Sequence, residues 1–124
     1  MVEITNEQCL EEIRGLTNDF DSRVNMDSTF IDSLKITLAQ PGNSFRGEMD
    51  APTNEIITKK VIGRGGYYFH LTTKNTGIYF IWHSRDTGKF IFWGSEYNVK
   101  QAMGVIRYRN KIVAQRELES VPKY

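Results

Sequence analysis

Four apolar residues near the start of the chain recur at the spacing of an amphipathic helix. They are Leu10, Ile13, Leu16 and Phe20. Thr5 and Gln8 form a capping-box pattern ahead of them, in which the threonine side chain accepts a hydrogen bond from the backbone three residues on. The sequence therefore predicts a helix over about residues 6–20.

A period of two follows further along the chain. Apolar and polar residues alternate over 34–38, which is typical of a half-buried strand. Pro41 and Gly42 then favour a turn, and 45–49 is a second short strand candidate. We therefore expect two short strands around a turn, preceded in 21–33 by a loop with a short helix.

The middle of the chain has the pattern of two helices separated by glycines. Thr53 can cap a helix that runs to Val61, and a second helix is predicted over 67–75, ended by Gly77. The connection between them is Gly63-Arg64-Gly65-Gly66, called the glycine loop below. Because glycine adopts positive φ angles at little cost, this connection can turn sharply.

The remaining pattern predicts a hairpin and a last helix. Two apolar strands, 78–83 and 89–93, flank a polar turn over 84–88, and a turn of this length favours antiparallel pairing. Ser95 can cap a final helix whose apolar residues fall at i, i+3, i+4 and i+7. These residues are Val99, Ala102, Met103 and Ile106.

Alternation along the hairpin assigns its side chains to two faces of a sheet. The residues expected to face the helices are Ile78, Phe80, Trp82, Phe90 and Phe92. Those expected on the other face are Tyr79, Ile81, Ile91 and Trp93. Large apolar residues there would make an exposed patch that needs a cover. We therefore expect the N-terminal helix, or a second chain, to pack across it.

Composition indicates one globular domain, or a small domain with an extension. The chain has 124 residues, of which 40% are hydrophobic. A single cysteine, Cys9, excludes a disulfide framework. The acidic N-terminus lacks a signal-peptide pattern, and no apolar run approaches the length of a bilayer span. We therefore expect an intracellular protein, cytoplasmic or nuclear, that does not bind membranes.

The charges are distributed unevenly along the chain. Residues 1–52 carry four cations and ten carboxylates, a net charge of −6, whereas 53–124 carry twelve cations and five carboxylates, a net charge of +7. Most of the aromatic residues also lie in the basic part. A basic segment rich in aromatic residues is expected to meet a polyanion.

The sequence offers little for catalysis. His70 and His83 lack the close spacing of a zinc site, and Cys9 lies on an acidic helix that would raise its pKa. The glycine loop is no dinucleotide fingerprint, because that pattern needs glycine where Tyr68 stands, and it does not match a P-loop. We expect no enzyme, no metal and no cofactor.

The second part of the chain resembles a K-homology (KH) domain. The matching residues are Val61-Ile62-Gly63-Arg64-Gly65-Gly66, Phe69, Thr76-Gly77, Phe80, Phe92, Gly94, Val99 and Ala102. The resemblance covers about residues 44–120 and implies an α+β fold of type I. In that fold, elements in the order β-α-α-β-β-α place three helices on one face of a three-stranded antiparallel sheet. Residues 43–124 would form this domain, and 1–42 an acidic N-terminal extension with a helix.

The resemblance also implies a function. A KH domain binds about four unpaired nucleotides of RNA in a groove beside its GxxG loop. The floor of this groove would be Ile62, Phe69, Phe80 and Trp82, and Lys89 or Arg85 would donate hydrogen bonds from its far rim. The phosphates would contact Gly63, Arg64, Gly65, Gly66, Lys59 and Lys60, and Tyr67 could stack on a base.

Two functions remain open from the sequence. The first is binding of single-stranded RNA, with single-stranded DNA as the alternative nucleic acid. The second is a KH-fold scaffold or protein-interaction module, with a homodimer or a partner protein on the outer face of the sheet. The intact glycine loop favours the first.

Overall fold

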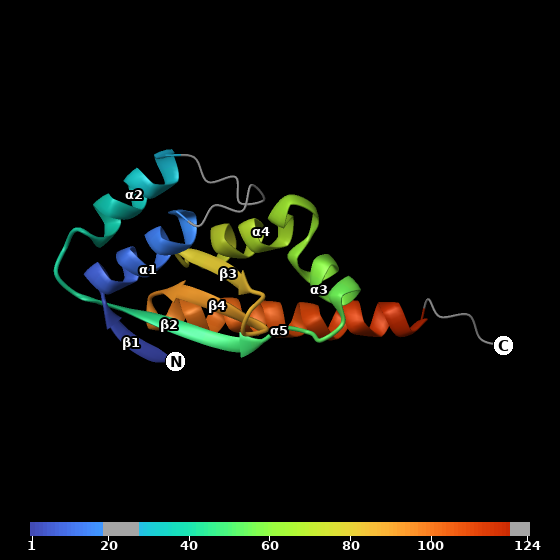
Figure 1. Ribbon diagram of the computed structural model, residues 1–124. Coiled ribbons are helices and arrows are strands. Elements are labelled where there is room, and N and C mark those ends of the chain that lie inside the picture. Colours follow the sequence, from blue (N-terminus) through green and yellow to red (C-terminus); the bar gives the residue numbers. More distant parts are fainter. Residues whose placement is uncertain (19–27, 120–124) are drawn as a thin grey trace.

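The chain folds into helices packed on both faces of one antiparallel sheet. The computed structural model describes residues 1–18 and 28–119. Its elements are β1 (Val2–Thr5), α1 (Asn6–Asn18), α2 (Ser28–Leu38), β2 (Asn43–Asp50), α3 (Glu55–Ile62), the short 3-10 helix η1 (Arg64–Gly66), α4 (Tyr67–Thr76), β3 (Phe80–Ser84), β4 (Lys89–Gly94) and α5 (Glu96–Glu119) (Figure 1). The expected α+β class is confirmed.

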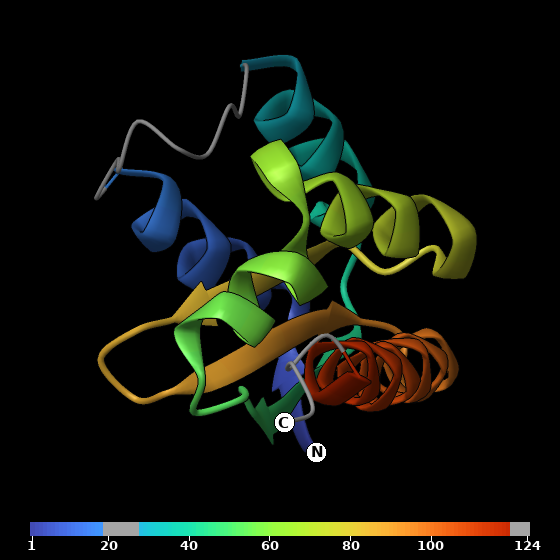
Figure 2. The same ribbon diagram turned by 90° about the vertical axis from the view of Figure 1, so that its right-hand side faces the viewer.

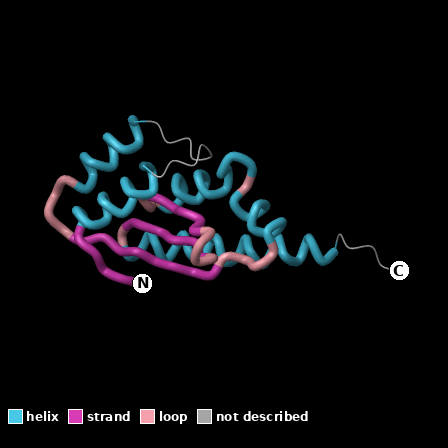
Figure 3. The backbone as a smooth tube through the Cα atoms, in the orientation of Figure 1, coloured by secondary structure: helices cyan, strands magenta, loops and turns pink. Residues whose placement is uncertain are grey.

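The sheet has four strands, in the order β1-β2-β4-β3 (Figure 3). The expected three-stranded sheet was therefore wrong: β1 pairs antiparallel with β2, with Ile4 opposite Ser44, and adds a strand beyond it. This strand is four residues long, and only Ile4 within it is buried. It belongs to the same sheet as the rest because its backbone completes the hydrogen bonding of β2.

One face of the sheet packs against α3, α4 and α5. The buried residues of this first core are Val61, Phe69, Ile78, Ile81, Phe90, Phe92, Val99, Ala102, Ile106 and Val113. Gly47 of β2 lets α5 approach closely, since a Cβ there would lie 2.6 Å from the sulfur of Met103 and 2.8 Å from Val99. The helix α5 runs along the sheet and continues beyond it (Figure 1), and Figure 2 views it end-on.

The opposite face of the sheet packs against α1 and α2. The buried residues of this second core are Ile4, Cys9, Ile13, Leu34, Leu38, Phe80 and Trp93. Leu10 and Leu16 of α1 pack against it, as does Ile91 of β4, and Arg46 of β2 forms an ion pair with Glu12 of α1. The outer face therefore has the expected cover, which comes from this chain itself. Phe20, also expected to contribute, lies outside the described residues.

The two faces of β3 are the reverse of those predicted. Phe80 lies opposite Trp93, and Ile81 lies opposite Phe92. Directly opposed residues of antiparallel strands point to the same face, so Phe80 and Trp82 face α1 and α2, and Ile81 faces the first core. The cause is the turn: Ser84 pairs with Lys89, so the turn is one residue shorter than predicted, and a shift of one residue reverses the side chains of β3. Ile78 and Tyr79, which precede β3, lie on the faces predicted for them.

The strand predicted over 34–38 is also wrong, because these residues end α2. Leu34 and Leu38 are buried four residues apart, which fits one face of a helix. A strand would place Ile36 on the same face as both leucines, but its side chain is 75% exposed.

The helix ends follow the sequence signals with one correction. The backbone N–H of Gln8 donates to Thr5 Oγ1 at 3.0 Å, as the capping pattern predicts. The N-cap of α3 is Asn54, where Thr53 was expected: Asn54 Oδ1 accepts hydrogen bonds from the N–H groups of Ile56 and Ile57. Gly77 ends α4 with a φ of 77°, as predicted.

Among the described residues, no helix combines the length and apolar character needed to cross a membrane.

Candidate nucleic-acid interface

The glycine loop is an exposed turn between α3 and α4. Gly63, Gly65 and Gly66 have φ angles of 84°, 63° and 77°, which other residues adopt only with strain. The N–H of Gly66 donates to the carbonyl of Gly63 at 3.0 Å and closes the turn. Arg64 and Gly65 are exposed, and a Cβ added at Gly65 would meet no atom within 4 Å. A ligand can therefore reach the bare backbone at Gly65.

The loop leads directly into the N-terminus of α4. Gly66 occupies the N-cap position and supplies no side-chain hydrogen bond, and the first turn contains no acidic residue. The N–H of Tyr67, the first residue of α4, donates to the carbonyl of Arg64. The first turn of the helix carries the positive end of the helix dipole. Tyr67 is 59% exposed at this end of the helix. The site thus combines an open glycine backbone, positive potential and an aromatic ring.

Arg109 of α5 links this helix to the end of α3, next to the glycine loop. Its Nε donates to the carbonyl of Val61 at 2.9 Å, and its Nη2 donates to the carbonyl of Lys60 at 2.6 Å. Its guanidinium carbon also lies 3.1 Å from the ring centroid of Tyr68. These contacts satisfy carbonyls at the C-terminus of α3 and bring a cation close to the glycine loop.

The predicted phosphate-binding cations differ in their partners. Lys59 lies 3.6 Å from a carboxylate oxygen of Glu55, and Lys60 forms an ion pair with Glu117. Arg64 is exposed, and the described part of the chain supplies no carboxylate within salt-bridge distance of it. Of these three cations, Arg64 is therefore the most available to an anion.

The structure does not bring the four predicted floor residues together. Phe69 is buried in the first core, with Ile62 packed at its edge. Phe80 is buried in the second core, where Trp82 packs against it at a ring distance of 6.0 Å. The predicted floor is therefore divided between opposite faces of the sheet, because the register of β3 differs by one residue from the expected one.

The two predicted rim residues lie on the β3–β4 hairpin. Arg85 is exposed in the turn. Lys89 begins β4, half-buried, with its amino group 4.0 Å from a carboxylate oxygen of Asp50.

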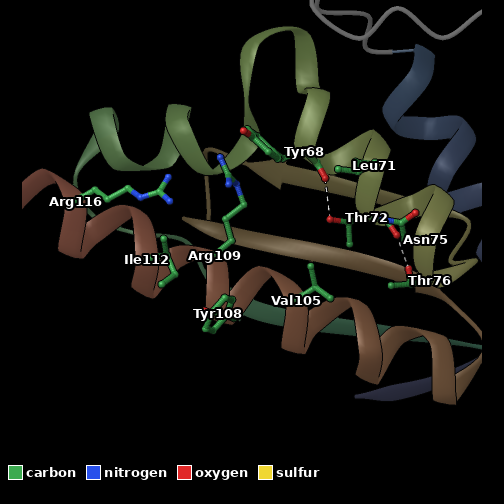
Figure 4. A pocket seen from close by; sticks show the side chains of 10 residues that line it. All are labelled: Tyr68, Leu71, Thr72, Asn75, Thr76, Val105, Tyr108, Arg109, Ile112 and Arg116. Atoms are coloured by element: carbon green, nitrogen blue, oxygen red, sulfur yellow. Dashed lines mark hydrogen bonds between the residues drawn. The ribbon is translucent and has the colours of Figure 1, made fainter.

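A pocket that the sequence interpretation missed lies between α4 and α5. Its volume is about 410 Å3 (Figure 4). The lining residues are Tyr68, Leu71, Thr72, Asn75, Thr76, Val105, Tyr108, Arg109, Ile112 and Arg116. A signal for it was present in the sequence, since Val105, Tyr108 and Ile112 form a second apolar stripe on α5, beside the stripe that faces the core.

The buried thiol is not a reactive group. Cys9 is fully buried in the second core, and the pKa of its thiol is raised to about 11, mainly by burial; a hydrogen bond with Ser44 opposes this rise and the Glu12 carboxylate contributes to it. A thiol that stays protonated is a poor nucleophile and metal ligand. Within the described residues, no three His, Cys, Asp or Glu side chains are grouped so as to bind a metal ion.

We expect the stability of the protein to depend on pH through His83. Its ring packs 5.3 Å from Phe90, and burial lowers its pKa below the ordinary value of 6.5. Below that pH the unfolded chain binds more protons than the native protein, so the free energy of unfolding decreases as the pH falls. We expect the urea midpoint of unfolding to decrease when the pH is lowered from about 7.5 to about 5.5. The midpoint of the variant His83→Gln should decrease less over the same range.

The exposed His70 provides the control for this measurement. The variant His70→Gln should retain the full decline of the wild-type protein. If the urea midpoints of His83→Gln and His70→Gln decrease equally as the pH is lowered, His83 is not the source of the pH dependence.

Taken together, the glycine loop presents an open backbone, an exposed cation and an exposed aromatic ring. Comparisons with protein-family models, with curated proteins and with solved structures find no match for this chain.

Proposed function

We propose that this protein binds single-stranded RNA and that the glycine loop holds its phosphodiester backbone. The observation that carries the proposal is the open backbone at Gly65, which lies next to Arg64 and leads into a helix N-terminus without a side-chain cap. The positive end of a helix dipole beside an exposed cation favours the binding of an anion. The exposed ring of Tyr67 can stack on a base, and unpaired bases are available only in a single strand.

We also propose that residues 43–119 form a KH-like unit. From β2 to α5 the strands and α-helices follow the order β-α-α-β-β-α, with η1 between the two adjacent helices. The three strands of this segment lie side by side in the order β2-β4-β3. This order supports the proposal. The added strand β1 and the helices α1 and α2 would then be an elaboration on the outer face of such a unit.

The protein-interaction alternative has less support. It needs an accessible outer face on the sheet, but α1 and α2 pack on that face and bury Trp93 and Phe80. Single-stranded RNA fits the exposed groups better, because the open backbone at Gly65, the cation of Arg64 and the ring of Tyr67 all lie at or beside the glycine loop.

The variant Gly65→Asp tests this proposal. It adds a negative charge where the loop is open and where aspartate tolerates the left-handed conformation better than most residues. Loss of a charge-assisted contact lowers affinity by about tenfold or more. The measurement is the fluorescence anisotropy of a labelled random-sequence RNA of about 12 nucleotides, at several salt concentrations.

Gly88 provides the matched control. It lies in the β3–β4 turn with a φ of 67°, and a Cβ there would also meet no atom within 4 Å. Gly88→Asp therefore introduces the same charge and the same backbone strain away from the glycine loop. We expect its affinity to stay within about twofold of the wild type. Equal losses in both variants, or wild-type protein without salt-dependent binding, would contradict the proposal.

A further inference from the structure

The pocket between α4 and α5 lies close to the glycine loop, although its lining includes no residue of the loop itself. Tyr68 and Arg109 both line it, and both also contact the loop region. The ring of Tyr68 lies 2.6 Å from the position that a Cβ on Gly63 would take, and Arg109 binds the carbonyls at the end of α3. Figure 4 shows both side chains at the end of the pocket nearest α3. Tyr68 and Arg109 therefore lie between the glycine loop and the rest of the pocket.

The walls of the pocket are apolar and partly open. Leu71 of α4 is 39% exposed, and Val105 and Tyr108 of α5 are 45% and 67% exposed. Ile112 completes the apolar wall on α5. The volume of about 410 Å3 is within the range of small-ligand sites. These exposed apolar side chains and the ring of Tyr108 suit a flat, partly apolar group.

The polar groups of the pocket favour an anionic ligand with hydrogen-bonding edges. Arg109 and Arg116 are the charged residues that line it, and none of the lining residues is acidic (Figure 4). Asn75 adds an exposed side-chain amide, which can both donate and accept. A nucleotide combines the required features, because its base presents a flat face with polar edges and its phosphate pairs with arginine.

We propose that this pocket holds a nucleobase of the same RNA strand whose phosphates lie at the glycine loop. The inference rests on the proposed function and adds the direction of the strand, which runs from the loop across α4 toward α5. The opposite direction, toward β3, offers less for a base, because the aromatic rings of Phe80 and Trp82 pack on the far side of the sheet. The ring of Tyr108 stacks on the base, and Arg116 neutralises the next phosphate.

The variant Tyr108→Ala tests the base site. Removing an aromatic ring that stacks on a base weakens binding by about 5- to 150-fold. The slope of affinity against salt should stay unchanged, because a tyrosine releases no counterions. Tyr108→Phe should bind like the wild type. Tyr97, 71% exposed on the same helix, is the control: it lies about 16 Å nearer the N-terminus of α5, and Tyr97→Ala should have no effect.

Photocrosslinking with a random-sequence RNA that contains 4-thiouridine locates the strand independently of any variant. We expect crosslinks to peptides of α4 and of residues 105–116. Crosslinks confined to β3 would overturn the inference, as would a Tyr108→Ala variant that binds like the wild type while Gly65→Asp binds weakly. Wild-type protein that binds no RNA would overturn the proposed function, and this inference with it.

Discussion

A chain that starts at Asn43 is expected to self-associate or aggregate more than the full-length protein. The missing residues supply β1, α1 and α2, which bury the outer face of the sheet. Their removal exposes Trp82, Ile91 and Trp93, together with Phe80. Aromatic side chains bury about 150–250 Å2 each, so the uncovered face exceeds the apolar patches of typical monomers. It also frees the edge of β2, which can then pair with another chain.

Sedimentation velocity and the fluorescence of a hydrophobic dye measure this effect. The control is the full-length variant Glu7→Gln with Glu11→Gln, which removes acidic charge from the exposed face of α1 and keeps its apolar face. It should keep the sedimentation coefficient of the unsubstituted full-length protein, which would assign the effect of truncation to lost cover and not to lost charge. A truncated chain that is soluble, monomeric and equally stable would contradict the packing of α1 and α2.

Local signals predicted most of the helices. The capping pattern at Thr5 and the helical stripe after it predicted α1, and the final stripe predicted α5. The exception was α2, because Leu34 and Leu38 fit both a strand and a helix in so short a segment. Only the exposure of Ile36 distinguishes the two, and exposure is a property of the folded chain.

The glycine loop could be predicted, and the path of the ligand could not. Positive φ angles at Gly63 and Gly65 follow from the residue type and its position between two helices. The face on which Phe80 lies depends on whether the hairpin turn includes Ser84, and the residues of this turn are compatible with either length. The aromatic side chains of β3 therefore pack in the second core, on the face of the sheet away from the glycine loop, because the register of the hairpin differs by one residue from the predicted one.

The sequence shows one wall of the pocket, the second apolar stripe on α5, and not the pocket itself. The end of the pocket near α3 is shaped by Arg109 of α5, which binds the end of α3 and stacks on Tyr68 of α4. These residues are far apart in the chain, and no periodicity joins them. An arginine on the exposed side of a helix is usually solvated, so its role here depends on the packing of three helices.

The second large effect is expected from Phe90→Ala. The Phe90 ring is fully buried in the first core, where it contacts Phe69 of α4 edge-on at 5.2 Å and His83 at 5.3 Å. Truncating a buried phenylalanine costs about 3–5 kcal/mol, because apolar contacts are lost and a cavity remains. A small domain has only about 5–15 kcal/mol of stability, so much of it would be lost.

Urea denaturation measures this loss, and Phe90→Leu serves as the control. Leucine refills most of the space, so its loss should be about 1.5 kcal/mol or less. Phe69 lies three residues after Gly66, and its contact with Phe90 is what seats the first turn of α4 on the sheet. The cavity in Phe90→Ala therefore lies under the proposed RNA site, and RNA should restore part of the lost stability by binding the native state alone. A loss below about 1 kcal/mol would show that the sheet does not support α4 through this pair of rings.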